Sequence, residues 1–206
     1  AGKGMGVEPS KYDTYDFLEK KEDLEALADL LGGIRDSLGN PAVFTTNMVM
    51  GNPDFQKIEK AGFEKYFHEY FLESYKRSYG QDLKAFWSTA IKNGIFFPQF
   101  HAREHLNMPL WIKDLQSGHK LTRLAFQHRF YGLKTKTSSA YQENYLAAYR
   151  AENLSELSQM TAIASSGLRM FEETFGQRSR TFIACNYIWP QELEKALLHK
   201  GIKVFQ

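Results

Sequence analysis

Residues 95–107 read IFFPQFHAREHLN, an apolar and aromatic run that leads directly into two histidines four positions apart. The run from Ile95 to Phe100 has the length and β-propensity of a short strand, and helix-compatible residues begin at Ala102. His101 is therefore predicted where a strand ends and a helical turn begins. If residues 101–105 are helical, the imidazoles of His101 and His105 project from one face and can reach the same ion.

Two imidazoles at this spacing can chelate a divalent transition metal, and zinc is the most plausible one. Two histidines within five residues also arise by chance, and the alternative is that both only form ordinary hydrogen bonds. The position of the pair favours a functional reading, because active sites of parallel α/β folds gather at the carboxyl ends of strands. We therefore expect His101 and His105 to be metal ligands.

Composition limits the classes of function. The 206 residues, 43% of them hydrophobic, can bury one substantial core, so we expect a single domain over residues 1–206. The 26 basic and 24 acidic residues leave a net charge of +2 without long charged blocks, which argues against a nucleic-acid partner. No apolar run approaches the roughly 20 residues that span a bilayer, so no membrane span is predicted.

Cysteine usage adds a second limit. Cys185 is the single cysteine of the sequence, so an internal disulfide framework and a zinc site built from several cysteines are both excluded. The redox compartment stays undecided.

Hydrophobic periodicity predicts alternating helices and strands. A polar loop over 134–139 is the best candidate for a mobile flap, and the segment 63–79, dense in aromatic residues, is expected to mix strand and helix. Gly51 to Asp54 should break a strand and open a short helix. The strands are expected at 42–50, 95–100, 181–185 and 202–205, and the helices at 21–38, 82–92, 111–115, 121–126, 154–175 and 190–198.

This alternation indicates an α/β protein with consecutive β/α units and mostly parallel strands, as in a partial or distorted (β/α) barrel. The run over 42–50 is nearly continuous in β-prone residues, which is typical of a strand buried on both faces. The chain begins in irregular sequence and stops at an apolar strand, which would expose sheet edges. We therefore expect barrel elements to be missing at both termini.

Three segments together resemble the polysaccharide deacetylase superfamily, in its deacetylase-like bacterial branch. They are PAVFTTN at 41–47, FHAREHLN at 100–107 and FIACNYIWP at 182–190, and the resemblance covers nearly the whole chain. It implies a distorted (β/α) barrel in which His101 and His105 are the metal ligands of the second family motif. Tyr187 corresponds to a residue that lines the substrate groove.

The sequence departs from the family pattern at several positions. Ala102 stands where a serine or threonine is usual, and the segment 184–187 has no arginine. The family's first strand carries an Asp-Asp pair, one carboxylate acting as base and the other binding metal, yet these 206 residues contain no such pair. The late histidine motif is also unmatched. We expect these elements to lie outside this chain.

The resemblance implies a metal-dependent hydrolase that removes acetyl groups from a carbohydrate. Zinc, or another divalent transition metal, would be held by His101, His105 and a carboxylate from outside the chain, and would polarise the carbonyl and activate a water. The substrate-binding candidates are Tyr187, Asn186, Trp189, Asn47 and Asn107. Arg103 and Glu104 are expected to orient the metal ligands or to face solvent. No catalytic residue is assigned.

Two other functions fit the same residues. Without a carboxylate pair, the protein could be a non-catalytic carbohydrate-binding or structural barrel. Residues 101–105 also match the H-x-x-E-H signature of a zinc peptidase, with Glu104 as general base and Glu172 or Glu173 as third ligand. That signature needs a continuous helix, which Pro98 and the aromatic run before His101 disfavour.

Overall fold

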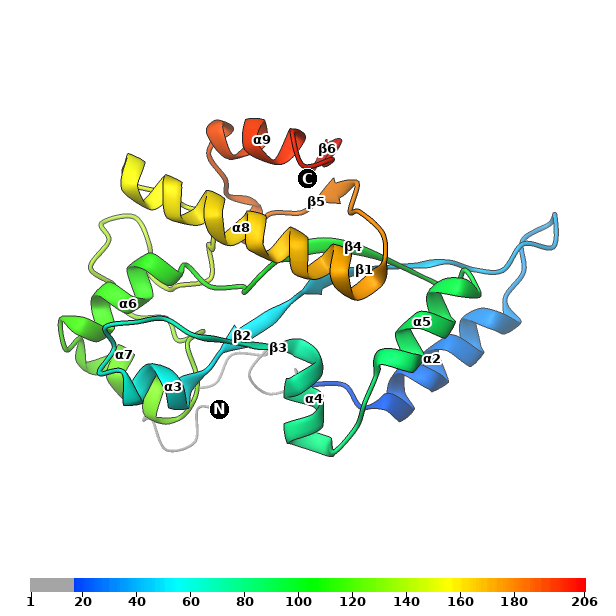
Figure 1. Ribbon diagram of the computed structural model, residues 1–206, viewed down its shortest axis with the longest axis horizontal. Coiled ribbons are helices and arrows are strands. Elements are labelled where there is room, and N and C mark those ends of the chain that lie inside the picture. Colours follow the sequence, from blue (N-terminus) through cyan, green and yellow to red (C-terminus); the bar gives the residue numbers. More distant parts are fainter. Residues whose placement is uncertain (1–16) are drawn as a thin grey trace.

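A computed structural model describes residues 17–206, which fold into eight α-helices, a four-stranded sheet and a two-stranded sheet (Figure 1). The helices are α2 (Lys21–Gly33), α3 (Phe55–Lys60), α4 (Phe71–Tyr79), α5 (Lys84–Lys92), α6 (Met108–Gln116), α7 (Lys120–Gln127), α8 (Leu154–Phe175) and α9 (Gln191–Leu198). The strands are β1 (Phe44–Val49), β2 (Gly51–Pro53), β3 (His68–Tyr70), β4 (Phe96–Ala102), β5 (Thr181–Phe182) and β6 (Val204–Phe205), and a 3₁₀ turn, η1, covers Cys185–Tyr187.

The larger sheet has the order β1-β4-β5-β6, and each of its three pairings is parallel. The expected mixed α/β architecture with mostly parallel strands is therefore confirmed. The smaller sheet pairs β2 with β3 in antiparallel fashion. Within the described range the larger sheet is open, with β1 and β6 at its edges, and the barrel stays a prediction.

Helix α8 runs across the sheet close to β4, and one glycine permits this approach (Figure 1). A Cβ atom at Gly167 would lie 2.8 Å from the ring of Phe100 and 2.8 Å from Cβ of Arg103. Real Cβ atoms do not come so near to other heavy atoms. Gly167 therefore sets the distance between the longest helix and the strand that carries His101.

The ends of α8 follow the sequence signals. The Asn153 side chain accepts a hydrogen bond from the backbone N–H of Glu156 at 3.0 Å, and the Glu156 carboxylate accepts one from the N–H of Glu152 at 2.8 Å. Gly176 ends the helix in the left-handed conformation, with φ of 66°. Cap and stop residues act locally, which is why they identified this helix correctly.

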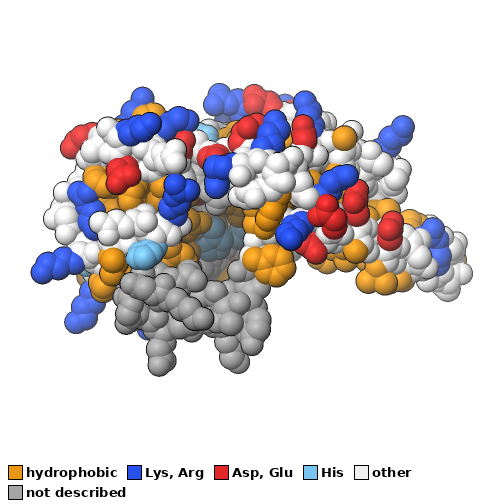
Figure 2. All heavy atoms as spheres, turned by 90° about the horizontal axis from the view of Figure 1, so that it is seen from below, with side chains coloured by type: hydrophobic (Ala, Val, Ile, Leu, Met, Phe, Trp, Pro, Cys, Tyr) orange, Lys and Arg blue, Asp and Glu red, His pale blue; other side chains and the backbone are white. Residues whose placement is uncertain are grey.

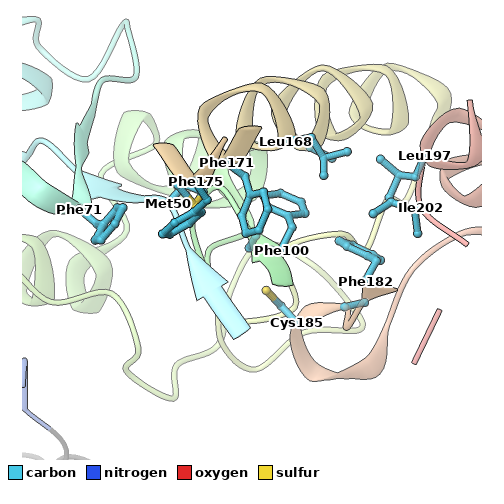
Figure 3. Packing of buried hydrophobic residues seen from close by; sticks show 14 of the residues in the cluster. Met50, Phe71, Phe100, Leu168, Phe171, Phe175, Phe182, Cys185, Leu197 and Ile202 are labelled. Atoms are coloured by element: carbon cyan, nitrogen blue, oxygen red, sulfur yellow. The ribbon is translucent and has the colours of Figure 1, made fainter. Parts of the chain in front are cut away.

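Two hydrophobic clusters stabilise the fold. The main cluster packs the parallel sheet against α8 and extends to α4, α5 and α9, and Figure 3 shows Phe100, Phe171 and Phe182 packed together within it. A smaller cluster is centred on Trp111 and joins α6 and α7 to the region of α3. The two clusters mark two regions of the molecule, one around β4 and α8 and the other around α6 and α7.

The structure corrects the expectation for residues 42–50. We expected a strand buried on both faces, but β1 lies at the sheet edge, and Thr45, Asn47 and Phe44 are exposed, Phe44 to 45%. The order of strands in a sheet is a tertiary property. The β-propensity of the run identified a strand and could not reveal its place at the edge.

Several predicted boundaries are also corrected. Helix α2 ends at Gly33, which leaves Ile34 and Leu38 49% and 84% exposed beyond the buried stripe. Residues 51–53 form β2, where a break was expected, and β5 and β6 have two residues each. The remaining predicted helices are confirmed to within a few residues, as is the mixture of strand and helix over 63–79. None of the described helices combines the length and the apolar character that crossing a membrane requires.

Candidate metal centre

His101 occupies a bulge in β4. Met48 pairs with Phe100 and Val49 pairs with Ala102, so His101 is an extra residue without a partner in β1. The strand runs through Ala102 and is followed by bends at 103–106, so the expected helical turn over 101–105 is wrong. A bulge turns a side chain away from the regular alternation, and bulges are common beside active sites.

The two imidazoles nevertheless converge. The ring centroids of His101 and His105 lie 5.1 Å apart, with an angle of 54° between the rings. The bulge and the following bends bring the rings together, in place of the helical spacing that the sequence indicated. The sequence predicted correctly that the two imidazoles lie close together, but it predicted a helical turn where the structure has a bulged strand followed by bends.

The orientation of His101 is set by a backbone carbonyl. Nδ1 of His101 lies 2.5 Å from the carbonyl oxygen of Ile183. A carbonyl can only accept, so Nδ1 carries the hydrogen and the neutral ring keeps a lone pair on Nε2. Metal-binding histidines commonly donate their other ring N–H to a carbonyl in this way.

Cys185 completes the cluster. Its Sγ lies 3.8 Å from Nε2 of His101, and the ligand atoms of His101, His105 and Cys185 all lie within 4.8 Å of one another. The sequence reasoning missed this residue because it considered only sites with several cysteines. Parallel pairing of Phe100 with Phe182 brings the cysteine to the histidines, and Figure 3 shows Cys185 next to Phe182.

The donor set fits a transition metal. Bonds of about 2.0 Å to nitrogen and 2.3 Å to sulfur place tetrahedral ligand atoms about 3.5 Å apart. The 3.8 Å between His101 and Cys185 is close to this distance, and the ligand atoms of the whole cluster lie within 4.8 Å of one another. Nδ1 of His105 is buried and has no hydrogen-bond partner among the described residues, so no hydrogen bond prevents this nitrogen from binding a metal. Three protein ligands would leave a fourth position open, as they do in catalytic zinc sites.

Burial controls the charge of all three side chains. It lowers the pKa of His101, with a further contribution from the neighbouring His105, and it lowers the pKa of His105. Burial also raises the pKa of the Cys185 thiol. The histidines are thereby kept in the neutral form that binds metal, and the thiol must release a proton when it becomes a ligand.

Arg103 and Glu104 form a buried ion pair between the two histidines. Nε of Arg103 lies 2.7 Å from Oε1 of Glu104, and the two residues are 8% and 1% exposed. Burial raises the pKa of the Glu104 carboxyl, and the adjacent guanidinium opposes this shift. These side chains do not face solvent. They anchor the segment that carries both histidines.

The predicted substrate-binding residues lie in different environments. Asn107 is buried and caps α6: its Oδ1 accepts from the N–H of Leu110 at 3.3 Å, and its amide donates to the carbonyl of Arg150 at 3.0 Å. Trp189 donates from Nε1 to Glu194 at 2.8 Å and stacks on Phe205. The polar groups of Asn107 and Trp189 are thus engaged within the protein.

Asn186, Tyr187 and Asn47 are accessible. Asn186 and Tyr187 follow Cys185 and have positive φ values of 55° and 56°, and Tyr187 is 74% exposed. Asn47 lines a cavity of about 610 Å³ on the sheet, together with Gln99 and with Ile183, whose carbonyl binds His101. The surface in Figure 2 is hollowed between the α6–α7 part and the α4 part, and histidine atoms lie in the hollow.

The helix that the H-x-x-E-H peptidase signature needs is not formed, because His101 belongs to a strand and Glu104 is paired with Arg103. Glu172, one proposed third ligand, instead pairs with Arg178 at 3.0 Å.

No family model, curated protein or solved structure matches this chain.

Proposed function

We propose that this protein is a metal-dependent hydrolase that removes acetyl groups from a carbohydrate, on a distorted (β/α) barrel. The observation that carries the proposal is the convergence of His101, His105 and Cys185 within 4.8 Å of one another, next to the carboxyl end of β4. The resemblance of residues 100–107 and 182–190 to polysaccharide deacetylases supports the choice of reaction.

In this proposal Cys185 takes the place of the carboxylate expected as the third ligand. When bound, zinc or another divalent transition metal supplies a Lewis acid that polarises the acetyl carbonyl. The chain's own residues prepare the site: the carbonyl of Ile183 fixes the ring of His101, and the Arg103–Glu104 pair holds the segment between the histidines.

The carbohydrate is proposed to approach from the accessible side of the centre. Tyr187 and Asn186 follow Cys185 directly and offer a phenol and an amide to sugar hydroxyls. Asn47 offers a second amide in the cavity beside Ile183. Neutral hydrogen-bonding groups of this kind suit an uncharged polar substrate.

A non-catalytic carbohydrate-binding barrel is the second candidate. The sequence has no Asp-Asp pair, so the roles of base and carboxylate ligand have no family counterpart in these residues. A binding module needs neither role. Metal content and acetate release separate the two candidates.

Metal content is the first test. Elemental analysis of the purified protein should find about one equivalent of zinc, which His101→Ala, His105→Ala and Cys185→Ala each remove. His128→Ala is the matched control, because His128 is exposed at the end of α7. Zinc retained by the three variants, or missing from the unchanged protein after zinc reconstitution, would refute the proposed centre.

Acetate release is the second test. The zinc-loaded protein should release acetate from an N-acetylated or O-acetylated oligosaccharide, and His101→Ala should abolish this release. A protein that binds zinc and the oligosaccharide but releases no acetate is a binding module. Circular dichroism of each variant shows whether a loss of activity comes from unfolding.

A further inference from the structure

A second cavity, of about 690 Å³, opens at the start of α7 and uses none of the residues of the metal centre. It lies in the region of the smaller hydrophobic cluster, where α6 and α7 meet the loop that follows α7. Its lining residues are His119, Lys120, Leu121, Lys134, Thr135, Lys136 and Glu143.

The wall of the cavity is largely apolar, and its charged groups are mostly cationic. Three lysines stand against the single carboxylate of Glu143, which leaves a charge of +2 without counting His119. Glu143 already pairs with Lys134 at 2.6 Å. Lys120 and Lys136 form no ion pair within the part of the chain that the structure describes. Two ammonium groups are therefore free to bind an anion.

The start of α7 adds backbone donors. The first N–H groups of a helix have no acceptor within the helix, and here they belong to Lys120 and Leu121. The side chain of the N-cap residue His119 bonds the N–H of Thr122, at 3.4 Å, and the hydroxyl of the same residue, and the first turn contains no acidic residue. Free amides and the positive end of the helix dipole both attract an anion.

Thr135 gives an independent indication of a ligand. This residue lines the cavity, is only 6% exposed, and its hydroxyl has no hydrogen-bond partner among residues 17–206. Its backbone is held in place, since its N–H donates to the carbonyl of Glu143 at 2.6 Å. A buried hydroxyl without a partner is costly, and a rotation of the side chain toward the cavity would let a ligand oxygen satisfy it.

A buried chain of polar groups holds the two walls of the cavity together. The chain of polar groups begins at Asp114, whose carboxylate accepts from the N–H of Ser138 at 3.0 Å and from the hydroxyl of Tyr145 at 2.8 Å. The Tyr145 hydroxyl lies 2.5 Å from that of Thr122, which lies 2.8 Å from Nδ1 of His119. The lysine-bearing loop and the start of α7 are thus positioned before any ligand binds.

We propose that this cavity binds an oxyanion, the phosphate or carboxylate group of a small molecule. The amides of Lys120 and Leu121, the ammonium groups of Lys120 and Lys136, and the hydroxyl of Thr135 are its donors. Phosphate and carboxylate share this chemistry, and the test distinguishes them. The proposal does not depend on the metal centre or on deacetylation.

The test is a titration of the full chain with inorganic phosphate, and in parallel with glucuronate, followed by amide NMR at constant ionic strength. We expect saturable shifts at the amides of Lys120, Leu121 and Thr135, and the tighter of the two probes identifies the anion. An absence of saturable shifts at these amides with both probes would overturn the proposal.

Matched variants assign the donors. Lys136→Gln should weaken binding about tenfold, as expected for one charge-assisted hydrogen bond, and Thr135→Val should weaken it about threefold. Thr135→Val keeps the side-chain shape and removes a hydroxyl without a partner, so the fold should be retained. Lys92→Gln removes an equal charge from an exposed position at the end of α5 and should leave the affinity for the anion unchanged. Equal weakening by Lys92→Gln, or no weakening by the two cavity variants, would contradict the proposal.

Discussion

The candidate metal centre and the cationic cavity are built in opposite ways. His101 and Cys185 are 84 positions apart and meet only because β4 pairs with β5 against the main core. The cavity is formed by residues between His119 and Glu143, next to the smaller cluster around Trp111. The first site depends on long-range burial, whereas the second depends on local hydrogen bonds and surface charge.

Among the variants that compare these two regions, the largest loss of stability is expected from breaking the buried ion pair of Arg103 and Glu104. Arg103→Leu leaves the Glu104 carboxylate buried without its partner, and should lower the free energy of unfolding by about 3–5 kcal/mol. Urea unfolding followed by circular dichroism measures the loss. The double variant Arg103→Leu with Glu104→Leu should recover much of it, because no unpaired charge remains. A double variant less stable than Arg103→Leu would show that the pair is not the cause.

The next effect concerns the contact between α8 and β4. Gly167→Ala places a methyl group 2.8 Å from the Phe100 ring, and should cost about 1–3 kcal/mol of stability. It should also weaken zinc binding, because Phe100 precedes His101. Gly33→Ala is the control, since nothing lies within 4 Å of its added Cβ atom, and it should be neutral or slightly stabilising. Equal losses of stability in both variants would contradict the role assigned to Gly167.

Removing the hydroxyl of a buried tyrosine in each region gives a direct comparison of the two. Tyr145→Phe removes a hydroxyl bonded to Asp114 and Thr122, and should cost about 1–2 kcal/mol and weaken phosphate binding at the cavity. Tyr149→Phe removes a hydroxyl that has no partner within residues 17–206, and should be close to neutral. Thermal unfolding and the phosphate titration measure both effects. Similar costs for the two variants would contradict the assigned hydrogen bonds.

The last effect concerns the pH dependence of the metal-free protein. Burial lowers the pKa of His101 and of His105, so the unfolded chain binds more protons below its own histidine pKa of about 6.5. Stability should therefore fall as the pH falls from about 7 to 5, by at most about 1.4 kcal/mol per pH unit for each proton. Unfolding in urea with a chelator, at several pH values, gives this slope.

The double variant His101→Gln with His105→Gln should reduce the slope. His68, whose pKa is also lowered by burial, remains in the variant and gives a residual slope in the same direction. Glu104 acts in the opposite direction, because burial raises its pKa and its contribution is lost as the pH rises through the folded pKa. An unchanged slope in the double variant would mean that the two histidines titrate alike in the folded and unfolded chains.

The sequence by itself determined the helices with clear periodicity and caps, α8 above all, and the strand that leads to His101. It also identified the pair of histidines as the place to look for a metal. These features follow from residues within a few positions of one another, so local spacing, capping and turn residues are sufficient to read them.

Only the tertiary structure decided that β1 lies at an edge, that His101 sits in a bulge, and that Cys185 joins the histidines. It also decided that the hydroxyl of Thr135 is buried in the wall of a cationic cavity. The order of strands, the register between them and the approach of distant side chains arise from burial of the whole chain. No local pattern in the sequence records them, because the interacting residues are far apart along it.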